Sequence, residues 1–432
     1  MFKTMSAVIV ATLDKHSGKT TLSRPSTQRC ACTGGVTVVF EGSIYSPRCA
    51  ASGAEALAAK LQLEGSVKAA EAFLREADGD FAFIIAEQER IVAGRDAVGV
   101  QPLYYGETAN FAALATRKRA LWALGIANVK SFPPGHLALV NRSGFKFRAV
   151  KRLVYSEPKP VSMADAAMML QQLLWESVRT RVSGLSEVAV AFSGGLDSSL
   201  IAFLASKCHV HVNLVHVSLK NRAETAEARR TAEALGLPLQ VHLFNEEDVA
   251  EAASAVTALI EEADPVKVGI GIPFYWTAEK AATAGFKVLL AGQGADELFG
   301  GYQRYVKAYV GYGAEKARKM MFDDVAGLHE NNLERDAKIC SFHGVELRLP
   351  FAAYKLAEFA VALPVELKFE RKTDSLRKLV LRKAAENLGL PPSIAAKPKK
   401  AVQYSTGVNA VLKRKAMKQN ITVAEYVRRL SG

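Results

Sequence analysis

A glycine- and serine-rich segment, 193–199 (SGGLDSS), has the residue types and spacing of a phosphate-binding loop. It follows the apolar run 188–192, typical of a strand buried on both faces, and precedes the apolar run 200–204, typical of a helix. At such a junction the backbone N–H groups and the helix dipole attract an anion, and glycine lets the backbone approach a phosphate closely. Asp197 would repel phosphate unless a cation lay between them, so we interpret it as a Mg²⁺ ligand. The alternative is a tight turn capped by serines.

A second segment, 291–302 (AGQGADELFGGY), follows the apolar run 287–290 and has similar chemistry. Its small residues let the backbone reach a nucleotide, and Asp296 adds a second carboxylate, which with Asp197 could hold a Mg²⁺ ion that bridges phosphates. The alternative is a solvated acidic turn. The first segment is not a Walker A loop, because no Gly-Lys-Ser/Thr closes it.

The elements that must position these two segments alternate between strand and helix from about residue 187 onward. The expected strands are 188–192, 210–217, 239–243 and 287–290, with helical stretches such as 223–235 between them. This alternation indicates a parallel, doubly wound sheet, in which ligands bind at the carboxyl ends of the strands. Both segments fall at such strand ends.

The chain upstream has a different pattern, which indicates a mixed α+β layered domain. The expected elements are strands 7–10, 36–40, 81–85, 90–93 and 136–140 and helices 54–61 and 66–77. A polar stretch with two prolines follows. We therefore predict one domain over 1–152, a linker over 153–162 and a second domain over 163–432.

The composition of the 432 residues limits the compartment and the partners. Five scattered cysteines do not resemble a disulfide framework and indicate a reducing, cytoplasmic location. No run approaches the roughly 20 apolar residues of a membrane helix, so we expect no membrane partner. The formal net charge of +13 can attract nucleic acid, but no nucleic-acid-binding module is recognisable, so we do not expect that partner.

The segment 193–199 resembles the pyrophosphate loop of ATP pyrophosphatases, which cleave ATP between the α and β phosphates. Three further segments make the chain similar to the asparagine synthetase (glutamine-hydrolysing) family: 94–106 (GRDAVGVQPLYYG), 291–302 and 336–351 (DAKICSFHGVELRLPF). The resemblance implies an α+β N-terminal nucleophile hydrolase-like layered domain, followed by an α/β ATP pyrophosphatase (PP-loop, adenine nucleotide alpha hydrolase-like) domain with a parallel sheet. It also implies ATP and Mg²⁺ as cofactors.

The same resemblance implies roles for individual residues. The residues implied to bind the nucleotide are Ala191, Phe192, Ser193, Gly194, Gly195, Leu196, Asp197, Ser198, Ser199, Val217, Ala291 and Gly292, with Asp197 and Asp296 on the metal. Lys338 matches a basic position that contacts pyrophosphate. Lys399 matches the lysine of an Arg-x-Lys segment that reaches the reaction centre, and the spacing also allows Lys400. The alternatives are a buried strand valine at 217 and a solvated basic run at 397–400.

Gln293 is included among the catalytic positions, although it departs from the family pattern. Bacterial members have a glutamate there, which is linked to handling the aminated intermediate and ammonia. A glutamine can hydrogen-bond but cannot accept a proton at neutral pH. The stretch 267–271 (KVGIG) is also more apolar than the family's aspartate-binding region. These departures leave open a different substrate, a different nucleophile or another base.

The N-terminal domain departs from the family's glutaminase in three places. Ser6 aligns with the nucleophilic N-terminal cysteine, but it is internal and its hydroxyl ionises less readily than a thiol. The family's Arg-Gly-Pro-Asp loop has only 23–26 (SRPS) as a remnant, and Glu41 stands where negative charge would oppose a developing oxyanion. We predict that glutaminase activity is lost and that the domain is a scaffold. The alternative is translation from Met5, with Ser6 as an N-terminal nucleophile.

These features together predict an ATP-dependent carbon–nitrogen ligase. It would adenylate a small-molecule carboxylate, the aspartate side chain or an analogue, release pyrophosphate and transfer the acyl group to ammonia or an amine. One alternative is amide formation on another acid, as in β-lactam synthetases. The others are a PP-loop enzyme acting on RNA and a nucleotide-binding regulator. A homodimer and a separate source of ammonia stay open.

Overall fold

The computed structural model describes residues 8–25, 30–47, 52–372, 376–397 and 406–430. The chain divides into two compact units, Met1–Leu153 and Val154–Gly432. Ser6, Lys399 and Lys400 lie outside the described residues. Over the described ranges, no helix combines the length and apolar character needed to cross a membrane.

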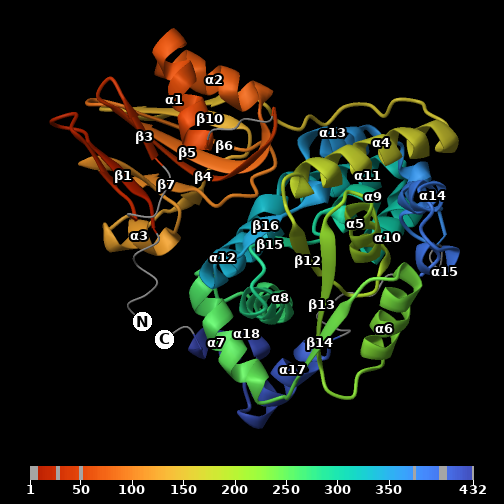
Figure 1. Cartoon of the computed structure of the whole chain (residues 1–432). Helices are drawn as coiled ribbons and strands as arrows, with labels where there is room; N and C mark the ends of the chain where they lie inside the picture. The colour runs from red at the N-terminus through yellow and green to blue at the C-terminus, as the bar shows by residue number, and fades with distance from the viewer. Residues whose placement is uncertain (1–7, 26–29, 48–51, 373–375, 398–405, 431–432) are drawn as a thin grey trace. The chain divides into compact units, whose positions relative to one another are not determined.

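The first unit contains two antiparallel sheets, with strand orders β2-β1-β8-β7-β9 and β11-β10-β6-β5-β4-β3 (Figure 1). Its strands are β1 Val10–Asp14, β2 Thr20–Ser23, β3 Cys30–Thr33, β4 Val36–Ser46, β5 Asp78–Ala86, β6 Ile91–Arg95, β7 Tyr104–Glu107, β8 Phe111–Ala115, β9 Lys130–Ser131, β10 His136–Asn141 and β11 Gly144–Ala149. Its helices are α1 Gly53–Glu64, α2 Ser66–Glu76 and α3 Lys118–Ala123.

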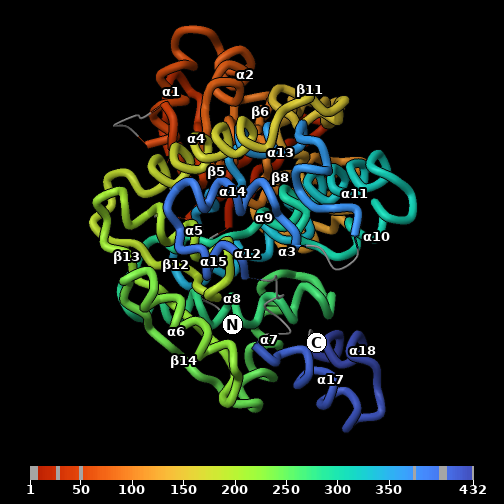
Figure 2. The backbone as a smooth tube through the Cα atoms, turned by 90° about the vertical axis from the view of Figure 1, so that its right-hand side faces the viewer, coloured from red at the N-terminus to blue at the C-terminus, as the bar shows by residue number. Residues whose placement is uncertain are grey.

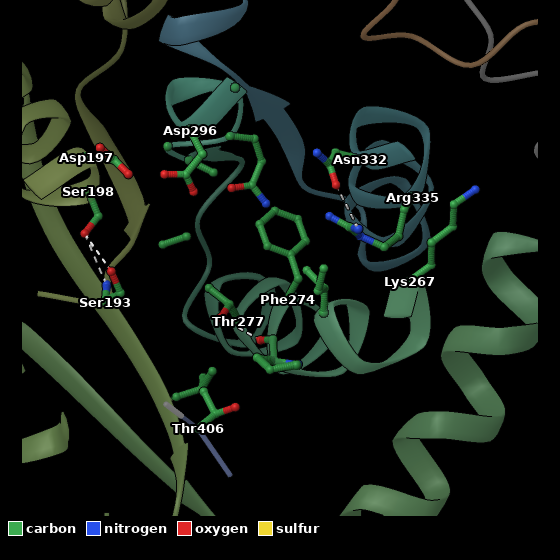
Figure 3. A pocket seen from close by; sticks show the side chains of 18 of the residues that line it. Ser193, Asp197, Ser198, Lys267, Phe274, Thr277, Asp296, Asn332, Arg335 and Thr406 are labelled. Carbon is green, nitrogen blue, oxygen red and sulfur yellow. Dashed lines mark hydrogen bonds between the residues drawn. The ribbon is translucent and has the colours of Figure 1, made fainter. Parts of the chain in front are cut away.

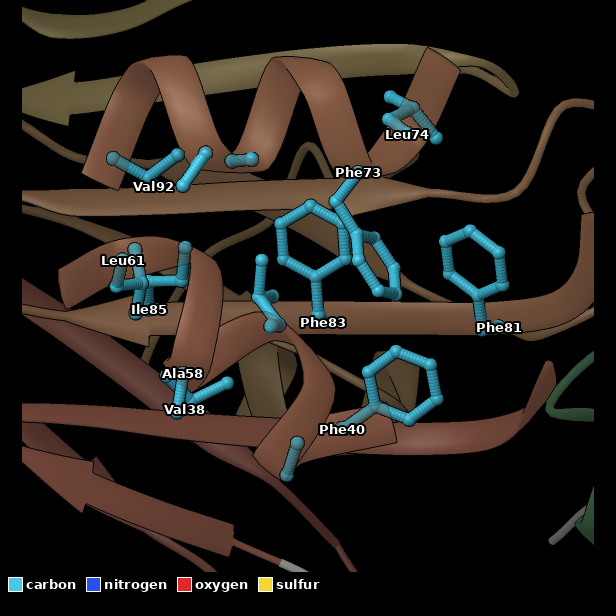
Figure 4. Close-up of a cluster of buried hydrophobic side chains, with 14 of the residues drawn as sticks. Val38, Phe40, Ala58, Leu61, Phe73, Leu74, Phe81, Phe83, Ile85 and Val92 are labelled. Carbon is cyan, nitrogen blue, oxygen red and sulfur yellow. The ribbon is translucent and has the colours of Figure 1, made fainter. Parts of the chain in front are cut away.

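Strand β5 shows why this unit is layered. Because side chains alternate along a strand, Phe81 and Phe83 point to one face, where they pack against Phe73 of α2 (Figure 4). Ala82 and Ile84 point to the other face and join a cluster that includes residues of β1 and β8 from the second sheet. The central sheet is therefore buried on both faces, between two helices and a second sheet, as the α+β layered prediction requires.

The second unit is built on a parallel sheet of order β14-β13-β12-β15-β16. Its strands are β12 Glu187–Ala191, β13 His211–Leu219, β14 Leu239–Phe244, β15 Val288–Leu290 and β16 Glu346–Arg348. The four predicted strands of this region are confirmed, with boundaries shifted by one or two residues.

Helices cover both faces of this sheet. The helices of the second unit are α4 Met163–Val182, α5 Leu196–Ser206, α6 Ala223–Leu235, α7 Asp248–Ile260, α8 Pro265–Thr283, α9 Ala295–Phe299, α10 Gln303–Tyr312, α11 Ala314–Ala326, α12 Glu334–His343, α13 Tyr354–Ala362, α14 Leu379–Asn387, α15 Pro392–Ala395, α17 Val408–Lys418 and α18 Val423–Arg429. Helices α5 and α6 lie on one face, and α8 and α12 lie on the other (Figure 1). Helices α17 and α18 pack against each other and against α7 and α8 (Figure 2).

The strand order reverses next to β12. From this first strand the chain adds β13 and β14 on one side, and later β15 and β16 on the other. In doubly wound sheets, such a reversal opens a crevice at the carboxyl ends of the two central strands. The two loops singled out from the sequence follow β12 and β15, so the topology brings both of them to this crevice.

Candidate active site

The loop between β12 and α5 is closed by its own serines. The Ser193 N–H donates to Ser198 Oγ at 3.3 Å, and the Gly195 N–H donates to Ser193 Oγ at 3.3 Å. Gly194 has a φ of +73°, and a Cβ there would come 2.9 Å from Ala228 Cα, so glycine is required. Helix α5 begins directly after the loop without a side-chain cap, which leaves its first N–H groups to an anion.

Two carboxylates lie on facing sides of the crevice beside this loop (Figure 3). Asp197 is in the first turn of α5, and Asp296 is in α9, just after β15. The Lys378 Nζ donates to both oxygens of Asp197, at 2.6 and 2.7 Å, and lies 2.7 Å from Asp296 Oδ1. The structure therefore brings the two predicted metal ligands close enough for one cation to contact both.

Sequence reasoning misses Lys378. Its local sequence does not separate it from Arg377 or Lys383, because all three belong to one basic stretch. The structural signal is the backbone: Lys378 has a φ of +62° at the start of α14, and its side chain is only 2% exposed. The cavity-lining residues include both aspartates but not Lys378. Lys378 therefore contacts the two carboxylates from outside the cavity. The side chains of Asp197 and Asp296 stay 18% and 15% exposed.

A cavity of about 490 Å³ lies at the crevice. The predicted nucleotide-binding residues that line it are Ala191, Phe192, Ser193, Asp197, Ser198, Val217, Ala291 and Gly292. Gly194, Gly195, Leu196 and Ser199 belong to the same loop and helix start but do not line it. Phe274 and Thr277 of α8 form part of its wall, as Figure 3 shows. The cavity thus has an apolar side suited to a flat base and a polar side suited to phosphates.

Gln293 follows β15 and makes a short hydrogen bond to a buried acid. Its Nε2 donates to Asp336 Oδ2 at 2.6 Å. The guanidinium of Arg335 donates to the two oxygens of the same carboxylate, at 2.7 and 3.0 Å. A glutamate at position 293 would place a second carboxyl group against Asp336, whereas a glutamine completes the hydrogen bonding. Gln293 and Arg335 both line the cavity.

The far wall of the cavity is polar. Glu297 accepts hydrogen bonds from the Tyr302 hydroxyl at 2.7 Å and from Asn332 Nδ2 at 2.8 Å. Burial, and then the Glu297 carboxylate, raise the pKa of the Tyr302 hydroxyl, which therefore stays a donor. The basic side chains that line the cavity each have an acidic partner: Lys267 with Glu262, Arg304 with Asp324, and Arg335 with Asp336.

Lys338 lies outside the cavity lining. Its Nζ donates to Glu261 Oε2 at 2.7 Å and to the Ile260 carbonyl at 3.1 Å, and the residue is 1% exposed. This ion pair joins α12 to the end of α7, and Lys338 is not among the residues that line the cavity. The structure therefore brings together Gln293, Asp197 and Asp296, but not Lys338.

In the first unit, Glu41 lies on β4 opposite Ala82 of β5. Its Oε2 is buried and has no hydrogen-bond partner among the described residues. Burial raises the pKa of this carboxyl, and the positive charge of Arg117 opposes the shift.

Comparison with known proteins decides the family. The model of the asparagine synthase family matches residues 169–313 and 309–423, and the model of the glutamine amidotransferase domain matches residues 23–123. The protein named "Putative asparagine synthetase (glutamine-hydrolyzing) 1" of Methanocaldococcus jannaschii is 35% identical over 392 residues, which cover 80% of this chain and 72% of that relative. The chain belongs to the asparagine synthase family. This membership confirms the predicted resemblance and the class of ATP-dependent carbon–nitrogen ligase; the two domain matches and the parallel sheet confirm the fold class.

Plant members of the asparagine synthase family are also similar. The asparagine synthetase (glutamine-hydrolyzing) of Asparagus officinalis is 30% identical over 356 residues, which cover 78% of this chain and 59% of the relative. The asparagine synthetase (glutamine-hydrolyzing) 3 of Arabidopsis thaliana is 28% identical over 360 residues, covering 78% and 60%. This family member thus spans about three fifths of the length of these two plant relatives.

Two solved structures match this chain at low similarity. The glutamine phosphoribosylpyrophosphate amidotransferase from B. subtilis has 13% identity and a TM-score of 0.27, over 55% of this chain and 59% of that one. The NMN synthetase from Francisella tularensis has 14% identity and a TM-score of 0.30, over 63% of this chain and 94% of that one.

Proposed function

We propose that this chain binds ATP in the cavity, activates a carboxylate as an acyl-adenylate and converts it to an amide. The observation that carries the proposal is the convergence of Asp197 and Asp296 on the Lys378 ammonium. They meet beside a phosphate-binding loop, where the strand order reverses. A cation held there neutralises the charge of the phosphates that the loop binds.

In the first step, a carboxylate oxygen attacks the α-phosphorus, the bond to the β-phosphate breaks, and pyrophosphate leaves with the electron pair. The backbone N–H groups and hydroxyls of 193–199 hold the leaving pyrophosphate. Asp197 and Asp296 would hold Mg²⁺, because both carboxylates are partly exposed to the cavity and Mg²⁺ is usually bound through one or two carboxylates plus phosphates. Lys378 keeps the two carboxylates in place. The role predicted for Lys399 or Lys400, over the α-phosphate, stays a prediction.

In the second step, an amine or ammonia attacks the acyl carbon, and AMP leaves with the oxygen. Gln293 can accept a hydrogen bond from this nucleophile. Asp336 is held by Arg335 and accepts hydrogen bonds, so the Gln293 amide must turn its NH₂ toward Asp336. The Gln293 Oε1 is then the atom left for the incoming N–H. Gln293 thus orients the nucleophile without taking its proton.

The side chain of aspartate is the acid that we propose. Aspartate carries an α-carboxylate and an α-ammonium, and the cavity offers both signs of charge. Arg304 and Arg335 line it with guanidinium groups that also pair with Asp324 and Asp336, and Glu297 lines it with a carboxylate. Val266 and Ile270, near the start of α8, add apolar surface to the lining of the cavity.

ATP–pyrophosphate exchange against a panel of free carboxylic acids tests this proposal. We expect Mg²⁺-dependent exchange with aspartate, which a chelator abolishes and added Mg²⁺ restores. Exchange with another acid alone would keep the reaction class and replace the substrate. If no free acid supports exchange, the adenylating function is wrong. Product analysis with ¹⁵N-ammonium then shows whether the nitrogen enters an amide.

We further propose that ammonia or an amine, and not glutamine, supplies the nitrogen. The support is Glu41, which has a buried carboxylate oxygen at the position where the family binds an oxyanion, together with a serine, not a cysteine, at position 6. Glutamate release from glutamine should stay at background while ¹⁵N-ammonium enters the product. Glutamine-dependent synthesis by a protein beginning at Met5 would support the alternative start instead.

A further inference from the structure

Lys397 contacts the phosphate-binding loop from outside the cavity. It follows α15, and its Nζ donates to the Gly194 carbonyl at 3.2 Å. The same Nζ donates to the Thr231 hydroxyl and lies 3.6 Å from Glu227 Oε1, both on α6. Lys397 is not among the residues that line the cavity. Its charge therefore acts on the loop and does not reach the nucleotide directly.

The Gly194 carbonyl matters because of the peptide group to which it belongs. This carbonyl and the Gly195 N–H share one planar peptide and point in opposite directions. With Lys397 on the carbonyl, the N–H points away from Lys397 and donates to Ser193 Oγ, a hydroxyl of the loop itself. Glycines on both sides make rotation of this peptide easy, and a rotated carbonyl would turn its negative end toward the phosphates. A side chain that fixes the orientation of the Gly194–Gly195 peptide therefore favours phosphate binding.

A second side chain fixes Lys397 itself. The Arg382 guanidinium donates to the Lys397 carbonyl at 2.8 Å and to the Arg377 carbonyl at 2.6 Å. Arg377 directly precedes Lys378, which holds the two aspartates. One guanidinium thus joins the backbone that presents Lys397 to the loop with the backbone that presents Lys378 to the carboxylates.

We propose that Lys397 is a positioning residue that holds the Gly194–Gly195 peptide in its phosphate-binding orientation. This inference rests on the proposed function, because it takes pyrophosphate as the ligand of the loop. This role requires a cation that can donate hydrogen bonds, as the Lys397 ammonium does. Thr231, whose hydroxyl lies 3.5 Å from the Gly194 carbonyl, assists it. The effect should fall on the binding of ATP and pyrophosphate and not on the chemical step.

Lys397→Met tests the role, because methionine keeps the length of the side chain and removes the donor. We expect KM for ATP in exchange and the directly measured Kd for ATP each to rise about tenfold, while kcat changes less than about threefold. Lys397→Arg should recover most of the affinity. Lys383→Met is the matched control, because Lys383 is an exposed lysine of α14 that pairs with Glu386.

The outcomes separate this inference from the proposed function. If the wild-type chain binds no ATP, the proposed function fails and this inference fails with it. Equal affinities of the wild type and Lys397→Met would overturn this inference alone, and so would a fall in kcat at constant KM. Should Lys397→Met not fold, Thr231→Val and Thr231→Ser take its place. We expect KM to rise about threefold for the valine variant alone, and equal KM values for the two would overturn the inference.

Discussion

Two settings of acidic residues in this chain differ in how their charge is balanced. In the second unit, Asp197 and Asp296 share the Nζ of Lys378, and Asp336 is satisfied by Arg335 and Gln293. In the first unit, Glu41 has a buried oxygen without a hydrogen-bond partner in the described part of the chain. Burying an acidic group without a partner costs free energy, so it needs a compensating function or a stable scaffold.

Another buried acid of the first unit, Asp96, has its hydrogen-bonding capacity filled. The Asp96 carboxylate accepts hydrogen bonds from the backbone N–H groups of Val98, Gly99, Val100 and Gln101. Burial raises the pKa of Asp96, while the charge of Arg95 and the N–H groups of Val100, Gln101 and Gly99 oppose the shift. The hydrogen bonding of Asp96 thus shows that a buried acid of this unit can be compensated, so the missing partner of Glu41 Oε2 is a local feature of the first unit. In the second unit, Asp197, Asp296 and Asp336 each have a basic partner.

The largest effect should come from Asp197→Asn, which removes a carboxylate from the balanced site. The loss of one of two carboxylates beside the phosphates should lower ATP–pyrophosphate exchange about a thousandfold. Asp323→Asn is the control, because Asp323 is an exposed acid of α11 that pairs with Lys319. Near-normal exchange by the Asp197 variant would show that the reaction centre lies elsewhere.

Lys378→Met leaves Asp197 and Asp296 facing each other without their shared cation. We expect about a hundredfold loss of exchange and a fall of about 2 kcal/mol in the free energy of unfolding, because like charges are left close together. Added Mg²⁺ should restore part of the stability, since it can take the place of the lost charge. Urea unfolding with and without Mg²⁺ measures this. A stability that does not change would contradict the role that we give to Lys378.

The sequence was sufficient for both loops and for four of the five strands of the sheet, though not for β16, because strands, glycines and carboxylates there follow local patterns. Val188 to Phe192 and Ser193 to Ser199 are contiguous, so their chemistry can be recognised from neighbours alone. Lys338 and Lys378 show where this stops. Each finds its partner across the fold, 77 residues away for Glu261 and 181 for Asp197, and no local pattern distinguishes a lysine in a buried ion pair from one beside the phosphates.

Gln293→Glu tests whether Asp336 and the glutamine at position 293, where bacterial family members have a glutamate, depend on each other. A carboxyl group would face Asp336, so we expect the free energy of unfolding to fall by about 1–2 kcal/mol. Adding Asp336→Asn exchanges the acid and amide ends of the hydrogen bond and should recover part of the loss. The double-mutant cycle measures the coupling in urea. Strictly additive effects would mean that the two side chains do not depend on each other.

The smallest effect concerns Glu41, and its pH dependence has a defined sign. Burial raises the pKa of Glu41 in the folded chain above its ordinary value of 4.5. Between these two pKa values the folded state binds more protons than the unfolded state, so stability falls as pH rises through that window. Above the folded pKa, the penalty of the buried charge is fully present. Glu41→Gln removes the charge and keeps the shape.

We therefore expect Glu41→Gln to stabilise the full chain by about 1 kcal/mol at pH 8 and by almost nothing at pH 4. Urea unfolding of both proteins from pH 4 to pH 8 measures the difference. Glu64→Gln, an exposed change at the end of α1, should give no such trend. If Glu41→Gln destabilises the chain at pH 8, the carboxylate has a favourable partner. The contrast between Glu41 and the balanced aspartates of the second unit would then be wrong, because Glu41 would be compensated as Asp197 is.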